Sequence, residues 1–156
     1  MSEVFYCKGW FRAKKRALEP YTAVQAQALH EGGELYCALI GSHTNPTCFL
    51  EVKRGFVGVG FLDEKLREVL SYSFQEEEPG KLFLSMATHR EFEPNSDKVL
   101  KGTSYIFSLD GKLIIRREVF SPSHKLDSAE RITDISANWE PFPKFGSYGH
   151  LVKAER

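Results

Sequence analysis

Long apolar segments, an excess of charge of either sign and closely spaced cysteines are all absent from this sequence. The apolar stretches are short, and Phe56–Leu62 is interrupted by two glycines, whereas a membrane-spanning helix needs roughly 20 apolar residues. The first residues also lack the apolar core of a secretory signal, so we expect a cytoplasmic protein with no membrane partner. Lysine and arginine together number 21, as do aspartate and glutamate, and this zero formal net charge argues against nucleic acid as a partner.

Metal-binding and nucleophilic motifs are equally scarce. The three cysteines, Cys7, Cys37 and Cys48, form no C-x-x-C pair, and no two of the five histidines stand two or four residues apart. We therefore expect reduced, partly buried thiols, no metal ligands and no cofactor. No phosphate-binding glycine motif or nucleophile elbow occurs, so we expect no catalytic residues. The enzymatic alternatives are Cys48 with a nearby histidine, and Glu91 with His89.

The composition is that of a folded globular protein. Apolar residues make up 42% of the 156-residue chain and charged residues 27%, which is ordinary for a soluble domain. A chain of this length buries roughly two thirds of its unfolded surface. We find no low-complexity linker, and we therefore expect a single domain spanning residues 1–156.

Alternating apolar residues predict β-strands through the middle of the chain. Val57, Val59 and Phe61 share one side of a strand, and Gly58 and Gly60 on its other side leave room for a neighbouring backbone or aromatic side chain. Pro79–Gly80 and Asp110–Gly111 have the composition of tight turns. Consecutive strands joined by such turns form an antiparallel meander. Strands are expected at residues 4–11, 35–40, 56–62, 70–74, 82–92, 104–108 and 113–120.

One helix and an aromatic segment complete the predicted fold. Residues 20–30 have high helix propensity, with Pro20 suited to the first turn and Val24 and Ala28 forming a narrow apolar stripe. Residues 121–156 combine three prolines with four aromatic residues, and we expect an extended segment that lies across the sheet or plugs a barrel. The predicted class is thus mainly β (α+β): an antiparallel meander of about six to eight strands, strongly curved or barrel-like, with one short N-terminal helix.

Acidic and basic residues are unevenly distributed along this neutral chain. Residues 1–18 hold five basic residues and one acid, whereas residues 60–93 hold eight acids and four basic residues. Charge segregation favours binding to a protein partner of complementary charge, although a solvated turn is the alternative for Glu76–Glu78. Two acidic turns are joined by a single strand and so should lie at opposite ends of the sheet. The candidate partner-binding residues are the acids Asp63, Glu64, Glu68, Glu76, Glu77, Glu78, Glu91 and Glu93, with Trp139 and Tyr148 as aromatic anchors.

Three stretches resemble small single-domain bacterial proteins that act as toxin-immunity factors. They are the strand-and-turn motifs of residues 55–93, GTSYIFSLDGKLII at residues 102–115 and WEPFPKFGSYGHLVK at residues 139–153. The resemblance implies a protein that binds and blocks one secreted toxin domain. Such families share no catalytic residues, so the resemblance assigns no site residue.

Three functional hypotheses follow. The first is a non-enzymatic, cytoplasmic immunity protein whose acidic surface neutralises a cognate toxin domain. The second is a β-barrel or regulatory domain that binds a small molecule, which predicts a lined cavity of about 300 Å³ or more. The third is an enzyme, which predicts a cysteine or histidine in a cleft with a strongly shifted pKa.

Overall fold

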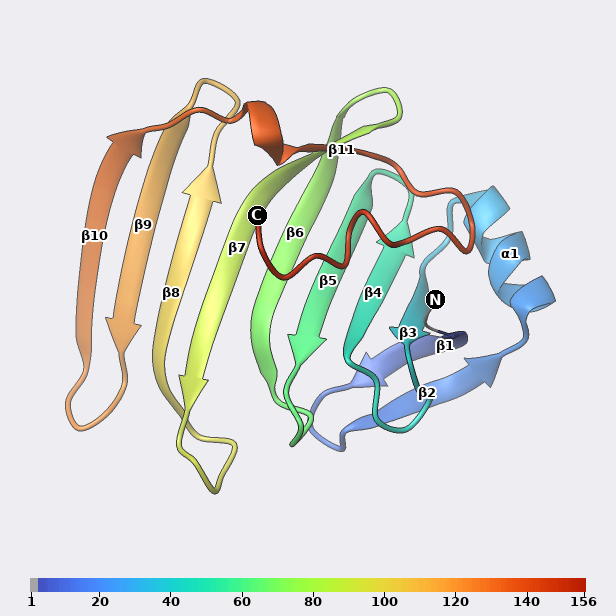
Figure 1. Cartoon of the computed structure of the whole chain (residues 1–156), viewed down its shortest axis with the longest axis horizontal. Coiled ribbons are helices and arrows are strands. Elements are labelled where there is room, and N and C mark those ends of the chain that lie inside the picture. Colours follow the sequence, from blue (N-terminus) through green and yellow to red (C-terminus); the bar gives the residue numbers. More distant parts are fainter. Residues whose placement is uncertain (1–2) are drawn as a thin grey trace.

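Residues 3–156, which the computed structural model describes, form one antiparallel sheet of eleven strands and a single α-helix (Figure 1). Ten strands follow the order β10-β9-β8-β7-β6-β5-β4-β3-β1-β2, and β11 pairs with β7 beside β8. From β3 to β10 each strand therefore pairs with the next one along the chain. The strands are β1 (Val4–Phe11), β2 (Arg16–Tyr21), β3 (Tyr36–Ile40), β4 (Cys48–Lys53), β5 (Phe56–Leu62), β6 (Glu68–Glu78), β7 (Lys81–Phe92), β8 (Val99–Phe107), β9 (Lys112–Val119), β10 (Lys125–Ile132) and β11 (Trp139–Pro141).

The predicted mainly β, antiparallel class is confirmed, but the expected number of strands is too low and the sheet does not close into a barrel. β2 and β10 stand at its two ends. β10 falls inside residues 121–156, which we expected to form an extended segment across the sheet rather than an outer strand of it. All eight residues of β10 are exposed, so no apolar alternation marks it in the sequence. β2 contains Pro20, which the sequence analysis assigned to the start of the helix.

The helix α1 (Ala23–Gly32) begins three residues later than predicted because Thr22 caps it. The Thr22 hydroxyl accepts a hydrogen bond from the Gln25 backbone N–H, and the Gln25 side chain accepts one from the Thr22 N–H, which is a capping box. Val24 was expected to dock on the sheet, yet it is 79% exposed. Ala26 is the fully buried residue of the helix instead.

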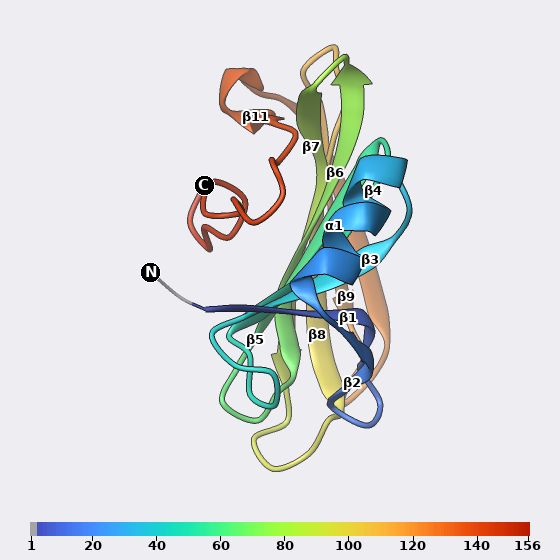
Figure 2. The same cartoon turned by 90° about the vertical axis from the view of Figure 1, so that its right-hand side faces the viewer.

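The C-terminal segment lies across one face of the sheet and completes the main core (Figures 1 and 2). Tyr148 and Leu151 are buried against strand residues there. The hydroxyls of Tyr148 and Tyr36 share a hydrogen bond of 2.9 Å, and the Tyr72 hydroxyl donates to the carbonyl of Ala154 at 2.9 Å. No helix within residues 3–156 is long and apolar enough to cross a bilayer.

Candidate functional site

The opposite face of the sheet carries a groove of about 560 Å³. Small residues on neighbouring strands make up much of its floor: Gly58 on β5 is opposite Ser73 on β6. Met86 on β7 is opposite Ser73 and continues the floor. Side chains alternate between the two faces of a strand, so Tyr72 and Phe74 enter the main core while Ser71 and Ser73 face the groove. The hollow exists because these strands place little side-chain volume on that face.

Aromatic side chains form one wall of the groove. Trp10 stacks on Phe49 with ring centroids 6.4 Å apart, and both are buried in a second apolar cluster. The Phe49 ring lies directly over Gly60, where a Cβ would come within 2.4 Å of it. The expectation that these glycines admit an aromatic ring is thereby confirmed at Gly60. Phe56 also lines the groove.

The turn that joins β1 to β2 arches over the groove. From this turn, Arg12 donates hydrogen bonds to Glu68 at 2.7 Å and to Glu51 at 2.9 Å, and its guanidinium lies 4.9 Å from the centre of the Phe49 ring. Burial opposes ionisation of Arg12, but the two carboxylates outweigh it and raise the pKa of this guanidinium. Lys15 then reaches Asp97 at 2.9 Å. The first hairpin is thus tied to the middle of the sheet.

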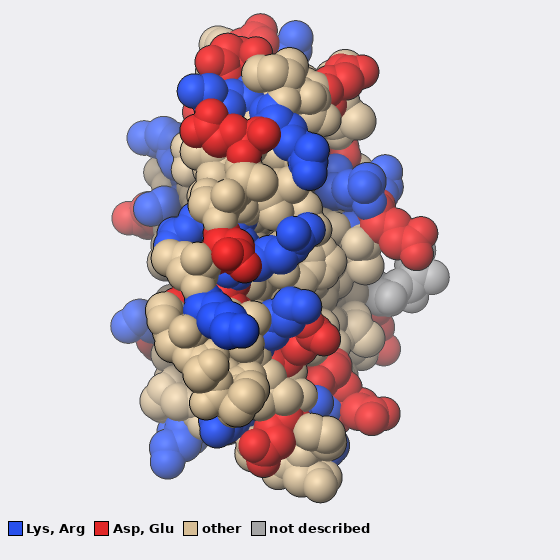
Figure 3. All heavy atoms as spheres, turned by 90° about the vertical axis from the view of Figure 1, so that its left-hand side faces the viewer, with Lys and Arg blue, Asp and Glu red and all other residues tan. Residues whose placement is uncertain are grey.

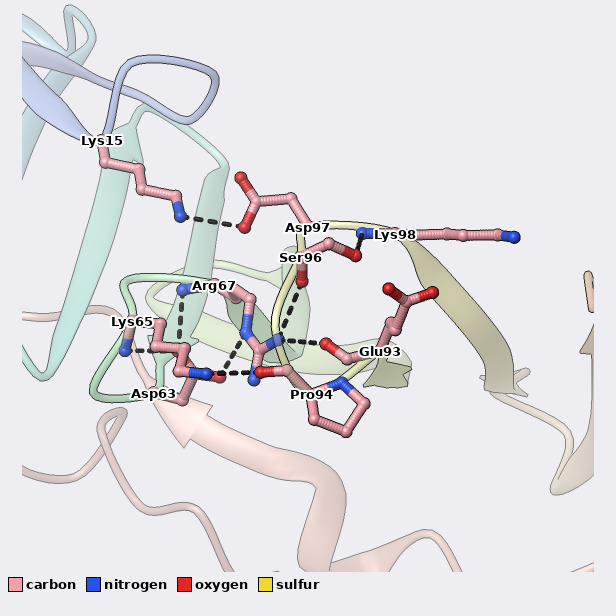
Figure 4. A network of polar contacts seen from close by, with 9 residues as sticks. All are labelled: Lys15, Asp63, Lys65, Arg67, Glu93, Pro94, Ser96, Asp97 and Lys98. Carbon is pink, nitrogen blue, oxygen red and sulfur yellow. Dashed lines mark hydrogen bonds and ion pairs between the residues drawn. The ribbon is translucent and has the colours of Figure 1, made fainter.

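Asp97, which the turn reaches through Lys15, lies beside a polar network around Asp63 and Arg67 (Figure 4). Asp63 accepts hydrogen bonds from the backbone N–H groups of Lys65 and Arg67 and from the Arg67 side chain. Although burial acts in the other direction, these bonds lower the pKa of Asp63. Arg67 also donates to the carbonyls of Glu93 at 2.7 Å and Ser96 at 2.9 Å. These hydrogen bonds therefore fix the position of the β7–β8 loop, which carries Asp97.

Polar groups capable of holding a ligand lie along the groove floor. Arg90 donates to the Ser71 hydroxyl at 3.2 Å and lies 3.9 Å from Glu68. A guanidinium has five N–H donors, so most of those on Arg90 remain for a ligand. Thr88 adds a hydroxyl, which is 3.1 Å from that of Ser104. The indole N–H of Trp10 is buried and has no hydrogen-bond partner among the residues that the structure describes, a costly arrangement in a protein interior.

The ten residues expected to bind a protein partner do not form one surface. The turn at Asp63–Glu64 and the strand end at Glu76–Glu78 lie at opposite ends of the sheet, as the sequence predicted (Figure 1). Asp63 and Glu68 are engaged in the ion pairs above, and Glu91 lies 3.8 Å from Lys101. Tyr148 is 3% exposed and lies in the main core on the other face of the sheet, and Trp139 packs on Phe83 with ring centroids 5.1 Å apart.

The thiols of the chain all lie in the protein interior, and the neighbouring Cys37 thiol lowers the pKa of Cys7, which has no exposed surface. All three cysteines are free and buried, and burial raises the pKa of Cys48 to about 11, so its thiolate is scarce at neutral pH. Burial lowers the pKa of His30, whose Nδ1 lies 2.8 Å from the Tyr36 hydroxyl in the core. Within residues 3–156 no three His, Cys, Asp or Glu side chains are grouped to hold a metal ion.

Sequence reasoning missed the groove because its residues come from five separate strands and three of the segments that connect strands. Gly58, Ser71 and Ser73 were noted only as spacers between apolar residues. What these residues share in the sequence is that they are small and stand at alternate positions of two adjacent strands. Family models, curated protein sequences and solved structures were each compared with the chain, and none matches it significantly.

Proposed function

We propose that the protein is a binding protein that holds a small amphipathic ligand in the groove of β5, β6 and β7. The observation that carries this proposal is the groove volume of about 560 Å³, which lies within the roughly 300–1,000 Å³ typical of ligand sites. An apolar wall faced by a few convergent polar groups is also the usual lining of such sites.

The lining indicates the chemistry of the ligand. Trp10, Phe56 and Met86 offer apolar and aromatic surface for a flat or hydrocarbon body. Arg90, with unused donors, and Thr88 offer hydrogen bonds to an anionic or carbonyl group. We therefore infer a ligand of modest size with an apolar body and one anionic or strongly accepting end.

Toxin neutralisation has less support from the placement of the residues. The acidic residues expected to bind the toxin lie at opposite ends of the central strands, and several of them already pair with basic residues of the same chain. The expected anchor Tyr148 is buried in the core. The immunity function stays a prediction, and retention of a toxin domain by the tagged protein in co-expressing cells tests it.

A fluorescence titration with 1-anilinonaphthalene-8-sulfonate tests the ligand-binding proposal, since this probe combines an aromatic body with a sulfonate. We expect saturable binding to the native protein. Ser73→Leu fills the groove floor and should weaken binding about tenfold or more, because the added side chain occupies the site. Thr103→Leu is the matched control: Thr103 alternates with Ser104 and lies on the other face of β8.

Two outcomes of the titration count against the proposal. Equal binding by wild type, Ser73→Leu and Thr103→Leu contradicts the proposal, as does the absence of saturable binding. The neutral analogue N-phenyl-1-naphthylamine then separates the two parts of the site. If Arg90 recognises an anionic end, the neutral probe binds more weakly than the sulfonate.

A further inference from the structure

The outer strand β10 (Lys125–Ile132) has one free edge. Within residues 3–156 it pairs only with β9, over all eight of its residues and without a register shift. Just beyond it, the Thr133 N–H donates to the Gly111 carbonyl on the β9 side. Backbone groups of an antiparallel strand alternate in direction. The N–H and C=O groups of Leu126, Ser128, Glu130 and Ile132 therefore point away from the sheet into solvent.

The two outer strands of the sheet, β2 and β10, differ in the features that hinder pairing with a further strand. β2, at the other end, contains Pro20, which lacks an N–H, and Glu19 has a φ of 41°, which breaks the regular extended backbone. β10 contains neither proline nor glycine, and none of its residues has a positive φ. Unprotected edges of this kind are templates for pairing with another strand.

The charges of β10 select one way of pairing the strand with a copy of itself. Two opposed residues of an antiparallel pair point their backbone groups either both toward the partner strand or both away from it, so a symmetric pair of β10 strands is centred on a residue rather than between two residues. Centring on Asp127, Glu130 or Arg131 places that charge opposite itself. Centring on Ser128 places Lys125 opposite Arg131.

Among the registers that pair at least five of the eight residues of β10, only the one centred on Ala129 avoids every like-charge pair. It places Asp127 opposite Arg131 twice, one pair on each side of the two-fold axis. It also places Leu126 opposite Ile132, and these side chains are 49% and 80% exposed in the single chain. Opposite charges and apolar pairs across adjacent strands are both stabilising. Figure 3, which looks onto this side of the molecule, shows basic and acidic side chains interspersed along it.

We propose that β10 is a self-association surface, where a second copy of the chain adds its own β10 in antiparallel orientation centred on Ala129. The two sheets then form one continuous sheet through a closed, two-fold contact. Both free edges are consumed, so the assembly stops at the dimer. The groove lies on strands β5 to β7 and is left open by this contact.

Sedimentation equilibrium from micromolar to millimolar concentration tests the proposal. We expect a reversible change from the 17.8 kDa monomer to twice that mass. Asp127→Arg and Arg131→Asp each place like charges opposite one another and should weaken dimerisation by about tenfold or more. The double variant D127R/R131D restores opposite charges and should recover the dimer, which a general loss of folding would not allow.

Ser128→Pro provides a second, independent readout. It removes one N–H at the free edge and leaves every hydrogen bond to β9 intact, so the monomer should keep its circular dichroism spectrum while the dimer is lost. Ser128→Thr is the control and should dimerise like the wild type. A monomer at all concentrations overturns the proposal, and so does a dimer that survives Ser128→Pro or is indifferent to the charge exchange.

Discussion

Gly60→Ala should destabilise the protein through a single collision with the Phe49 ring. A Cβ at position 60 would lie 2.4 Å from Cζ and 2.5 Å from Cε1 of Phe49, distances that real Cβ contacts do not show. Phe49 is 1% exposed and stacks on Trp10, so its ring has no free space to enter. Overpacking of this kind costs about 1–3 kcal/mol. Replacing glycine within a strand offsets about 0.5–1 kcal/mol of that cost, which leaves a net loss of up to about 2.5 kcal/mol.

Urea unfolding followed by circular dichroism measures the change in the free energy of unfolding. Gly102→Ala is the matched control, because a Cβ there meets only the His89 carbonyl at 3.8 Å, an ordinary contact. It should leave the stability unchanged or raise it by up to about 1 kcal/mol. Gly60→Ala should also weaken binding of the naphthalene sulfonate, because the displaced Phe49 belongs to the groove wall.

A double-mutant cycle isolates the collision. Phe49→Ala alone should cost about 3–5 kcal/mol, and Gly60→Ala added to it should cost nothing further because the ring is gone. Equal stability of Gly60→Ala and Gly102→Ala would refute the reasoning. An equal cost of Gly60→Ala with and without Phe49 would refute it as well.

Two further predictions concern the helix. Thr22→Ala removes the hydroxyl that caps α1 and should lower the free energy of unfolding by about 1 kcal/mol, whereas Thr22→Ser should retain most of it, as urea unfolding will show. Burial lowers the pKa of His30, so the native protein binds fewer protons than the unfolded chain just below that residue's usual pKa of 6.5. The stability that comes from keeping His30 neutral is therefore fully present above about pH 6.5 and falls as the pH drops below it. His30→Gln should lose less stability than the wild type between pH 8 and pH 5, and parallel pH profiles would contradict this.

The order of the central strands was predictable because their apolar residues alternate. Val57 and Val59 pack into the core as expected, and the turn at Pro79–Gly80 joins β6 to β7. β10 was not predictable from periodicity, since both of its faces are exposed. Its existence depends on pairing with β9, which is a tertiary contact.

The candidate site was less predictable than the fold. It forms because Arg12 reaches Glu68, which is 56 positions away in the sequence, and Lys15 reaches Asp97, which is 82 positions away. Local patterns carry no information on such distances. The acidic residues were identified correctly as unevenly distributed, but the sequence did not show that Asp63 and Glu68 pair with Arg67 and Arg12.

The two indole N–H groups allow the most direct test of ligand binding in the groove. Trp10 lines the groove, whereas Trp139 and the Phe83 ring on which it packs are not among the residues that line it. In a ¹⁵N–¹H correlation spectrum, the indole signal that disappears in Trp10→Phe belongs to Trp10. We predict that the naphthalene sulfonate shifts this signal, together with the amides of Gly58 and Ser73, and leaves the Trp139 signal in place. A shift confined to Trp139, or no shift of either indole at saturating probe, would contradict a ligand site in the groove.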